Sequence, residues 1–510
     1  MKKKFYVTTA IDYVNALPHL GTAYEKIGAD VLARFKRMMG YDVFFLMGVD
    51  EHSQNVARQA EKHNLPPKEY CDDMAAKFEN VWHSLDIQYD RFIRTTDSDH
   101  IIAVQELFQR IYDNGDIYKG AYTGWYCVSC EHFIPEKELV DGKCPVHKKE
   151  PQWLEEQNYF FRLSKYQQVL IDHIEKNPRF IEPEIRRNEI LNVLKGGLED
   201  ISVSRSTETW GIPVPFDNSS VVYVWFDALI NYITGAGFAS DNQRFSLQWP
   251  ADVHVIGKDI TRFHAVIWPA MLLAAGVAIP KQVFGHGFVY LGGEKMSKTA
   301  GTALDPVSLA EIYGPDPLRY FLMREIPFDR DGDFLMEKYE TRYNADLAND
   351  WGNLVQRVLS MVKKYRDGLV PAGMLDSSHD IVAEWKLLHD DLIKSIESLY
   401  DEMKFSVVLT KIWQMIQLSN RLVEVQAPWS LYKKDNASRE LDNTLYALLE
   451  MIRVANILLY PVLPTICKKI QHQLNIDTDF AIEEAAQLGI LKAGHSLGEI
   501  EPVFPKTKDK

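Results

Sequence analysis

The sequence has few cysteines, no basic excess and no long apolar run. Only five of its 510 residues are cysteine, which is too few and too clustered for a disulfide framework. Acidic side chains outnumber basic ones by 71 to 57, a net charge of −14, so local basic patches must hold any polyanionic partner. No segment approaches the roughly 18 apolar residues of a membrane span, and no apolar leader precedes the first strand-like run. We therefore expect a cytoplasmic protein without a membrane segment.

Two separated stretches have the pattern of a parallel α/β sheet. From Phe5 to Val49, a β-branched run, a turn, a helical segment ended by Gly40 and a second apolar run predict a βαβ unit. A second α/β stretch, about 222–291, contains VVYVWF, ADVHVIG, a helix in ITRFHAVIWPAMLLAAG, and QVFGHGFVYL. They belong to two α/β halves with about 110 residues, 114–221, between them, and so predict one nucleotide-binding fold with an insertion.

After Asp333 the strand signals end and long amphipathic helices follow. Their expected ranges are 336–365, 381–400, 406–426 and 441–459. This pattern predicts a separate helical bundle in the last third of the chain.

The turn PHLGT, residues 18–22, lies between the first apolar run and its helix. Free backbone N–H groups and the positive end of the helix dipole suit a phosphate there, and Gly21 permits a close approach. His19 adds a donor for that phosphate. Thr22 and Glu25 match the S/T-x-x-E capping box, so Thr22 is expected to cap the helix start. Taken alone, turn geometry without a ligand is the commoner explanation.

A second candidate loop, GGEKMSKTAG, follows the last apolar strand of the α/β part. Glycines bracket a short segment that carries Lys295 and Lys298, an arrangement that suits a mobile arm closing over a triphosphate. The alternative is a solvated hairpin that contains lysines.

The clustered cysteines have the spacing of a metal site. Cys127 and Cys130 form one CxxC knuckle, and Cys144 and His147 follow after thirteen intervening residues. Three thiolates and one imidazole can close a tetrahedral zinc site, in which all four positions come from the protein. The sequence therefore predicts one structural Zn²⁺ rather than a catalytic one.

The turn and the lysine loop together resemble the paired signatures of the class I aminoacyl-tRNA synthetases, in the expected order and about 275 residues apart. The surrounding sequence resembles the methionyl-tRNA synthetase family over nearly the whole chain. The stretches that carry this resemblance are YVTTAIDYVNALPHLG, GVDEH, WYCVSCEHF, EEQNYFFRLS, VYVWFDALINY, GKDITRFHAVIWPA, KMSKT and QAPW.

This resemblance implies a Rossmann-type catalytic domain with an inserted zinc-bearing connective domain, followed by an all-α anticodon-binding bundle. The implied boundaries are 1–113 and 222–291 for the catalytic halves, 114–221 for the insertion, 292–335 for the KMSKT loop and junction, 336–480 for the bundle and 481–510 for a C-terminal segment. No room remains for the family's optional dimerisation domain, so we expect a monomer.

The resemblance also implies the substrates, which are methionine, ATP with Mg²⁺, and tRNA(Met). Asp50 would pair with the ammonium of methionine, and six positions would line its side chain: Ile11, Trp225, Ala228, Tyr232, Ile260 and His264. His19, Lys295 and Lys298 would be catalytic, and ATP would contact these three with Gly21, Thr22, Gly257, Asp259 and Ser297. Asn353, Arg357 and Trp429 would read the anticodon.

Each of these positions also has a structural explanation. Without the resemblance, Trp225, Tyr232 and His264 would be assigned to the core, and the anticodon residues to a solvated face and a helix end. The family's turn usually ends in a second histidine, and Thr22 stands there instead. This difference puts the contribution of that position to ATP binding in doubt.

Other functions remain as alternatives. Leucyl, isoleucyl and valyl enzymes carry a large editing insertion, for which the segment between the halves has no room. A cysteinyl enzyme places its zinc at the substrate, whereas the four-ligand site expected here is closed. A zinc-bearing RNA-binding protein without catalysis would leave both HLGT and KMSKT without a role.

Overall fold

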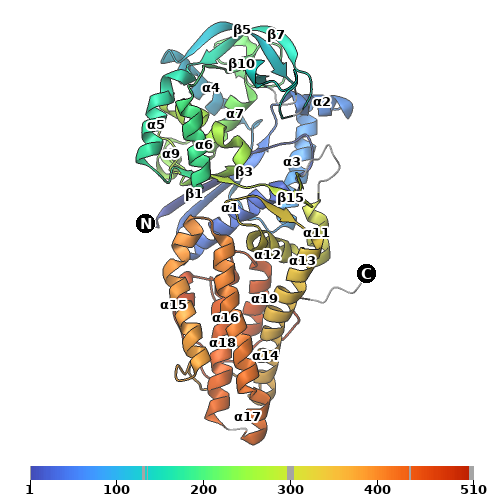
Figure 1. Ribbon diagram of the computed structural model, residues 1–510, viewed down its shortest axis with the longest axis vertical. Helices are drawn as coiled ribbons and strands as arrows, with labels where there is room; N and C mark the ends of the chain where they lie inside the picture. Colours follow the sequence, from blue (N-terminus) through green and yellow to red (C-terminus); the bar gives the residue numbers. More distant parts are fainter. Residues whose placement is uncertain are drawn as a thin grey trace.

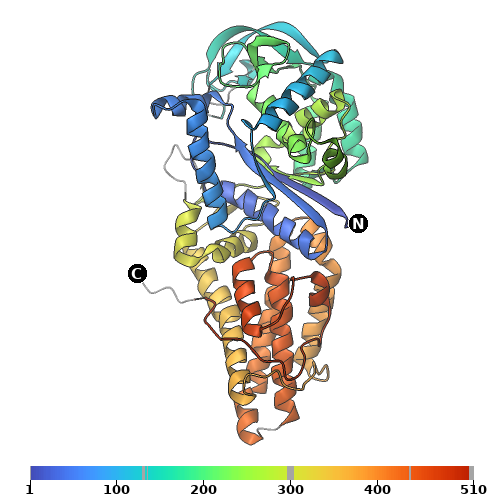
Figure 2. The same ribbon diagram turned by 180° about the vertical axis from the view of Figure 1, so that it is seen from behind.

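The computed structural model describes residues 2–128, 132–134, 136–146, 148–295, 304–435 and 438–504, and at 122–123, 132–133, 137, 154–156 and 294–295 the backbone alone. The molecule is elongated, with an α/β part at one end and a helical bundle at the other (Figure 1). Helix α1 (Leu20–Met38) lies where the two parts meet, and the view from behind shows the C-terminal segment running along the bundle (Figure 2).

A seven-stranded sheet forms the centre of the α/β part. Its order is β2-β3-β1-β13-β14-β8, with β4 beside β3, and all its pairings are parallel. The predicted βαβ unit is confirmed, because α1 connects β1 to β3 and ends before Gly40, which has a φ of +78°. The strands are β1 (Lys4–Thr9), β2 (Asp12–Tyr13), β3 (Asp42–Asp50), β4 (Arg91–Arg94), β8 (Ile181–Glu182), β13 (Val253–Gly257) and β14 (Val283–His286).

Side chains of the central strands alternate between two cores. Val7 and Met47 point into a core that α1 and the bundle share. Their strand neighbours Tyr6 and Leu46 point into a core with the helices of the other face. Those helices include α4 (Ser98–Asp113), α7 (Val224–Leu229), α8 (Asn231–Ala236) and α10 (Trp268–Ala274).

The segment between the two halves of the α/β part carries a four-stranded sheet of order β6-β5-β7-β9. It is not a separate unit throughout, because Ile181 of β8 pairs with Val283 at the edge of the central sheet. The elements are β5 (Ile117–Cys127), β6 (His132–Ile134), β7 (Gln152–Phe161), α5 (Gln167–Lys176), α6 (Glu184–Lys195), β9 (Ile201–Ser202), β10 (Ser204–Arg205), β11 (Pro213–Val214) and β12 (Asp217–Val222).

Two apolar runs of the second half are divided between elements. VVYVWF is split between β12 and α7, and QVFGHGFVYL between β14 and β15 (Val289–Leu291). Strand β15 leaves the central sheet and pairs with β16 (Glu294–Lys295) and β17 (Gly332–Phe334). This small sheet carries the chain to the KMSKT segment, of which residues 296–303 lie outside the described residues.

The bundle confirms the predicted helices closely. A π-helix, η5 (Tyr343–Gly352), interrupts the first of them, and the segment after α19 packs along the bundle, where Val370 N donates to His495 O at 2.8 Å. The other helices of this half are α11 (Pro306–Tyr313), α12 (Pro315–Glu325), α13 (Met336–Arg342), α14 (Asn353–Tyr365), α15 (Asp380–Asp401), α16 (Phe405–Gln426), α17 (Pro428–Lys434), α18 (Arg439–Leu459), α19 (Pro464–Leu474) and α20 (Ile482–Ala486).

A buried arginine connects the bundle to the α/β part. Arg319 of α12 donates to Asp30 of α1 at 2.5 Å and to the carbonyls of Pro461 and Val462 between α18 and α19. Because both charges are fully buried, the pair requires all these partners at once. Over the described ranges, no helix is both long and apolar enough to cross a membrane.

Candidate active site

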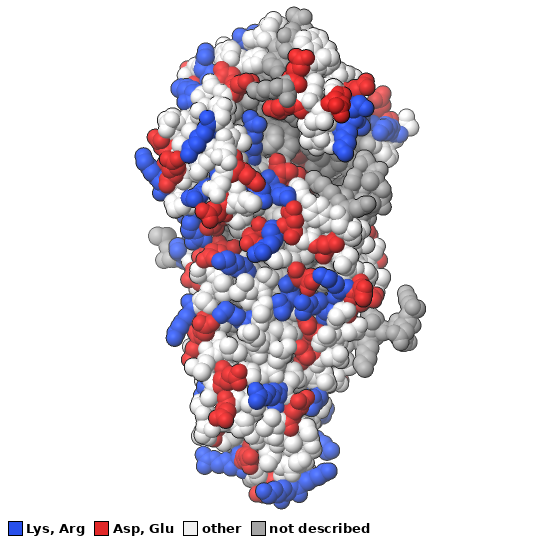
Figure 3. All heavy atoms as spheres, in the orientation of Figure 1, with Lys and Arg blue, Asp and Glu red and all other residues white. Residues whose placement is uncertain are grey.

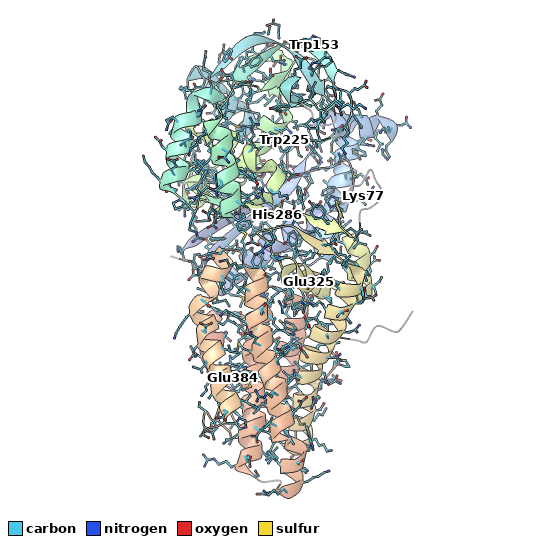
Figure 4. All side chains as sticks on the ribbon, viewed as in Figure 1. Lys77, Trp153, Trp225, His286, Glu325 and Glu384 are labelled. Atoms are coloured by element: carbon cyan, nitrogen blue, oxygen red, sulfur yellow. The ribbon has the colours of Figure 1, made fainter. Side chains whose placement is uncertain are left out.

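A cavity of about 200 Å³ opens at the carboxyl edge of the central sheet. It lies where β1, β3 and β13 end, the usual place for a ligand in a parallel α/β sheet. All seven positions that the resemblance implies for methionine line it, together with Gly257: Ile11, Asp50, Trp225, Ala228, Tyr232, Ile260 and His264. These residues come from four separate parts of the chain, and Trp225 is labelled in Figure 4.

His264 and Tyr232 form one wall of this cavity. His264 Nδ1 lies 3.0 Å from the carbonyl of Ile260, which can only accept, so Nδ1 carries the proton. Tyr232 Oη, 2.7 Å from Nε2, therefore donates to His264. Burial lowers the pKa of His264 to about 4, and the ring is neutral at pH 7. The wall is uncharged and aromatic, which suits an apolar thioether.

A chain of charges lies beside the same cavity on α1. The ammonium of Lys26 is 2.8 Å from both Asp12 and Glu25, and it also donates to the carbonyl of Ala10. Burial raises the pKa of Glu25, but Lys26 and His286 outweigh this effect and hold the pKa below its ordinary value. Lys26 thus binds two of the three acidic side chains that line the cavity, Asp12 and Glu25, and Asp50 is the third.

His19, and not Thr22, is the N-cap of α1. Its Nδ1 accepts a hydrogen bond from Thr22 N at 3.1 Å, and the helix begins at Leu20. The predicted capping box at Thr22 is therefore wrong, because Thr22 already lies in the first turn and Glu25 is turned inward to Lys26. The cap of α1 therefore uses Nδ1 of the His19 ring.

The described chain resumes after the KMSKT segment beside the start of α1. Leu20 N donates to Leu304 O at 3.1 Å, so the chain returns from the KMSKT segment beside the HLGT turn. Lys295 belongs to β16, whereas Ser297 and Lys298 lie outside the described residues. Gly257 ends β13 and Asp259 follows it at an exposed position, on the same edge of the sheet.

The zinc prediction can be followed for two of its four residues. Cys127, at the end of β5, and Cys144 are both buried and pack with Ile134 in a small cluster of the insertion. Cys130 and His147 lie outside the described residues. Two converging thiols are donors that zinc prefers, so the described part of the site fits the ion. Within the described residues no complete group of metal ligands is present.

The three positions implied for the anticodon lie on α14 and α17, two neighbouring helices of the bundle. Asn353 and Arg357 occupy the first turns of α14, exposed and partly exposed respectively, and the side chain of Trp429 is 40% exposed. The rings of Tyr365 and Tyr432 stack at 4.3 Å, which places α14 beside α17. Lysines and arginines gather at this tip of the bundle, whereas both signs of charge mix over the rest of the face in Figure 3.

Family models match the two parts of the chain separately. The model "tRNA synthetases class I (M)" matches residues 5–152 and 137–359, and "Anticodon binding domain of methionyl tRNA ligase" matches 371–510. A methionine–tRNA ligase of Caldanaerobacter subterraneus subsp. tengcongensis is 46% identical over 99% of this chain and 79% of its own length. That of Nostoc sp. is 45% identical over 99% of this chain and 97% of its own.

The chain belongs to the methionyl-tRNA synthetase family. Solved structures agree: Mycobacterium tuberculosis methionyl-tRNA synthetase in complex with methionyl-adenylate matches with a TM-score of 0.94 and 45% identity, over 99% of this chain and 100% of the other. The apo form of that enzyme matches with a TM-score of 0.87 and 42% identity, over 100% and 99%. The α/β fold with its helical anticodon domain is thereby confirmed.

Five further residues line the cavity and were not predicted: Ala10, Asp12, Tyr13, Glu25 and Leu229. Asp12 and Tyr13 directly follow the first strand, so the rule that ligands bind beyond the carboxyl ends of strands would have found them. Glu25 carried no such signal, because it was assigned to the capping box.

A larger cavity, of about 320 Å³, lies at the opposite, amino edge of the sheet. Lysines line it, but their charges are used within the protein. Lys36 pairs with Asp401 at 2.6 Å, and Lys281 pairs with Asp252 at 2.6 Å. It is a joint between α1, β13 and the bundle, and it holds none of the residues expected for the synthetase reaction.

Proposed function

We propose that this chain activates methionine with ATP to methionyl-adenylate and pyrophosphate, then transfers methionine to the 3′ end of tRNA(Met). One observation carries the proposal. Seven positions, scattered from Ile11 to His264 and implied by family resemblance, converge on one cavity beside the start of α1. Family membership supports the same reaction.

In the first step the carboxylate of methionine attacks the α-phosphate of ATP, and pyrophosphate leaves. A carboxylate is already a nucleophile at neutral pH, so the site needs no general base. Its task is to position the reactants and stabilise charge on the phosphates. His19 Nε2 and the N-terminus of α1, with Lys295 and Lys298, are the groups suited to that task. Mg²⁺ would enter with the triphosphate.

Methionine would enter the cavity with its ammonium toward Asp50 and its thioether toward Tyr232 and His264. Gly257 and Asp259 would face the adenosine, where the carboxylate can accept a bond from a ribose hydroxyl. Gly21 and Thr22 lie in the first turn of α1. Since Thr22 N is bonded to His19, the backbone N–H of Gly21 is the one suited to a phosphate in this turn.

Cys127, Cys130, Cys144 and His147 would hold one zinc ion. A closed four-ligand zinc has no open position for substrate and stabilises the fold of the insertion. We expect about one zinc per chain by atomic spectroscopy, lost in Cys144→Ser with loss of thermal stability. A zinc-free protein that keeps full stability would contradict this assignment.

The second step requires tRNA, which the bundle would recognise through Asn353, Arg357 and Trp429. Stacking of a base on an aromatic side chain contributes about 1–3 kcal/mol, so Trp429→Ala should lower kcat/KM for tRNA about 5- to 150-fold. Amino-acid activation takes place elsewhere and should not change. An equal loss in both steps would indicate misfolding instead of lost recognition.

The decisive experiment is methionine-dependent ATP–pyrophosphate exchange, followed by aminoacylation of tRNA(Met). Exchange that requires methionine, and ignores leucine, isoleucine, valine and cysteine, would support the proposal. A protein that binds tRNA but exchanges with no amino acid would favour the non-catalytic alternative. We further propose a cytoplasmic monomer, and a dimer mass in gel filtration would contradict the monomer.

A further inference from the structure

Three buried polar side chains meet behind the methionine cavity without lining it. The carboxylate of Asp227 lies 2.7 Å from His100 Nε2 and 2.8 Å from His52 Nδ1. Asp227 and His100 are fully buried, and His52 is 6% exposed. We call this group the His52–Asp227–His100 triad. Burying a carboxylate with two imidazoles is costly unless every group is bonded, so its place in the fold calls for a reason.

The triad joins the two segments that carry opposite sides of the cavity. His52 follows Asp50 by two residues, at the end of β3. Asp227 lies in α7, two residues after Trp225 and next to Ala228. Asp50, Trp225 and Ala228 all line the cavity. The carboxylate of Asp227 therefore connects the segment expected to hold the ammonium of methionine with helix α7, which is expected to hold its side chain.

The hydrogen-bonding groups of the triad form one consistent set of donors and acceptors. Burial alone would raise the pKa of Asp227, but the bonds from His100 and His52 hold it below its ordinary value. The ionised carboxylate can only accept, so both imidazoles donate to it. The hydroxyl of Thr234 lies 3.0 Å from Ile230 O and 3.2 Å from His100 Nδ1. Both nitrogens of His100 thus have a partner, Asp227 on one side and Thr234 on the other.

The segment between Asp50 and His52 is anchored on its other side as well. Arg94 Nε donates to the carboxylate of Glu51 at 2.8 Å. Trp210 Nε1 donates to the carbonyl of Glu51 at 2.6 Å, and its ring lies edge-on to His52, with centroids 5.3 Å apart. With Glu51 held from outside, His52 is the group by which this segment is bonded to α7.

We propose that the His52–Asp227–His100 triad positions Asp50 relative to Trp225 and Ala228, and so sets the affinity of the site for methionine. These are positioning residues, because none of them lines the cavity. The inference rests on the proposed function. The groups assigned to ATP, His19 on α1 and Lys295 on β16, belong to elements that the triad does not bond. Its loss should therefore affect methionine much more than ATP.

The test is exchange kinetics with His52→Ala and His52→Asn. Loss of a buried bond to a charged group should raise KM for methionine about 10-fold or more in His52→Ala, with KM for ATP within about twofold. Asparagine places an amide donor near the position of Nδ1, so His52→Asn should stay within about threefold of wild type. Asp227→Asn should raise KM for methionine at least as much as His52→Ala. If Asp227→Asn does not fold, the comparison of His52→Ala with His52→Asn tests the inference by itself.

His389→Ala is the matched control, because this histidine is buried in the bundle and donates to Ala485 O at 2.9 Å. It should leave both KM values unchanged. The inference is overturned if His52→Ala keeps the wild-type KM for methionine, if both KM values rise together, or if His52→Asn behaves like His52→Ala. A wild-type protein without methionine-dependent exchange would overturn the proposed function itself.

Discussion

The two edges of the central sheet both have a cavity surrounded by charged side chains, and they use the charges differently. At the amino edge Lys36 and Lys281 pair with acidic groups of the protein; one ion pair joins α1 to the bundle, and the other joins the start of β13 to that of β14. At the carboxyl edge Asp50 lines a cavity whose other wall is the neutral pair of Tyr232 and His264. The first arrangement holds parts of the protein together, whereas a concave site with a few polar groups beside an uncharged wall is suited to a ligand.

The largest expected effect at the carboxyl edge comes from His19. Removal of one donor to a transferring phosphate costs about 100- to 1000-fold in rate, so His19→Ala should nearly abolish methionine-dependent exchange. His19→Asn is the matched variant, because its side-chain oxygen can still accept from Thr22 N and cap α1. Exchange by His19→Asn near the wild-type rate would mean that His19 is only a helix cap.

Asp50→Asn should have the second largest effect. The amide retains the shape but not the charge that pairs with an ammonium, a contact of about 1.5–3 kcal/mol, so KM for methionine should rise about 10- to 150-fold. KM for ATP should remain close to wild type in the same exchange assay. If both KM values change equally, Asp50 supports the fold of the edge and not the binding of methionine.

His264 provides a test by pH. Its pKa is about 4 in the folded protein and about 6.5 when unfolded, so between these values the unfolded chain holds more protons. The stability that neutral His264 contributes is complete above pH 6.5 and is lost as pH falls toward 4, by up to about 3 kcal/mol. The free energy of unfolding, measured with urea, should therefore fall less between pH 7 and pH 4.5 in His264→Gln than in the wild type. Equal losses in both proteins would contradict a neutral buried ring.

The smallest effect is expected at the amino edge. Lys281 is half exposed in its pair with Asp252, and such pairs contribute about 0–1 kcal/mol, so Lys281→Gln should lower the free energy of unfolding by no more than that. Exchange should stay within about twofold of wild type. A large loss of exchange in this variant would show that the two edges are coupled and would break the distinction between them.

Much of the fold could be predicted because its signals are local. Apolar residues at helical spacing marked α15, α16 and α18 within one or two residues of their observed ends. The strand, turn and helix around HLGT were equally clear. The insertion was harder to predict. Strand β8 pairs with β14, about 100 residues further along the chain, and the two residues of β8 gave no local signal of this pairing.

The candidate site, too, could be predicted from the sequence only in part. Family resemblance named the seven residues that line the cavity with Gly257, but nothing in their spacing indicated that His264 is a neutral acceptor of the Tyr232 hydroxyl. The cap of α1 was assigned to the wrong residue, because the Thr22–Glu25 pattern is local while Glu25 is turned inward by Lys26 and His286. A long-range ion pair can override a local capping signal.

The sequence by itself determined the class of fold, the helices of the bundle and the two motifs of nucleotide chemistry, since periodicity and residue type act over short distances along the chain. Only the tertiary structure decided that His19 caps α1, that Asp50 and Trp225 face one cavity, and that Asp227 bonds His52 to His100 behind it. These facts depend on the register of strands and the packing of helices far apart in the chain, which no short pattern specifies.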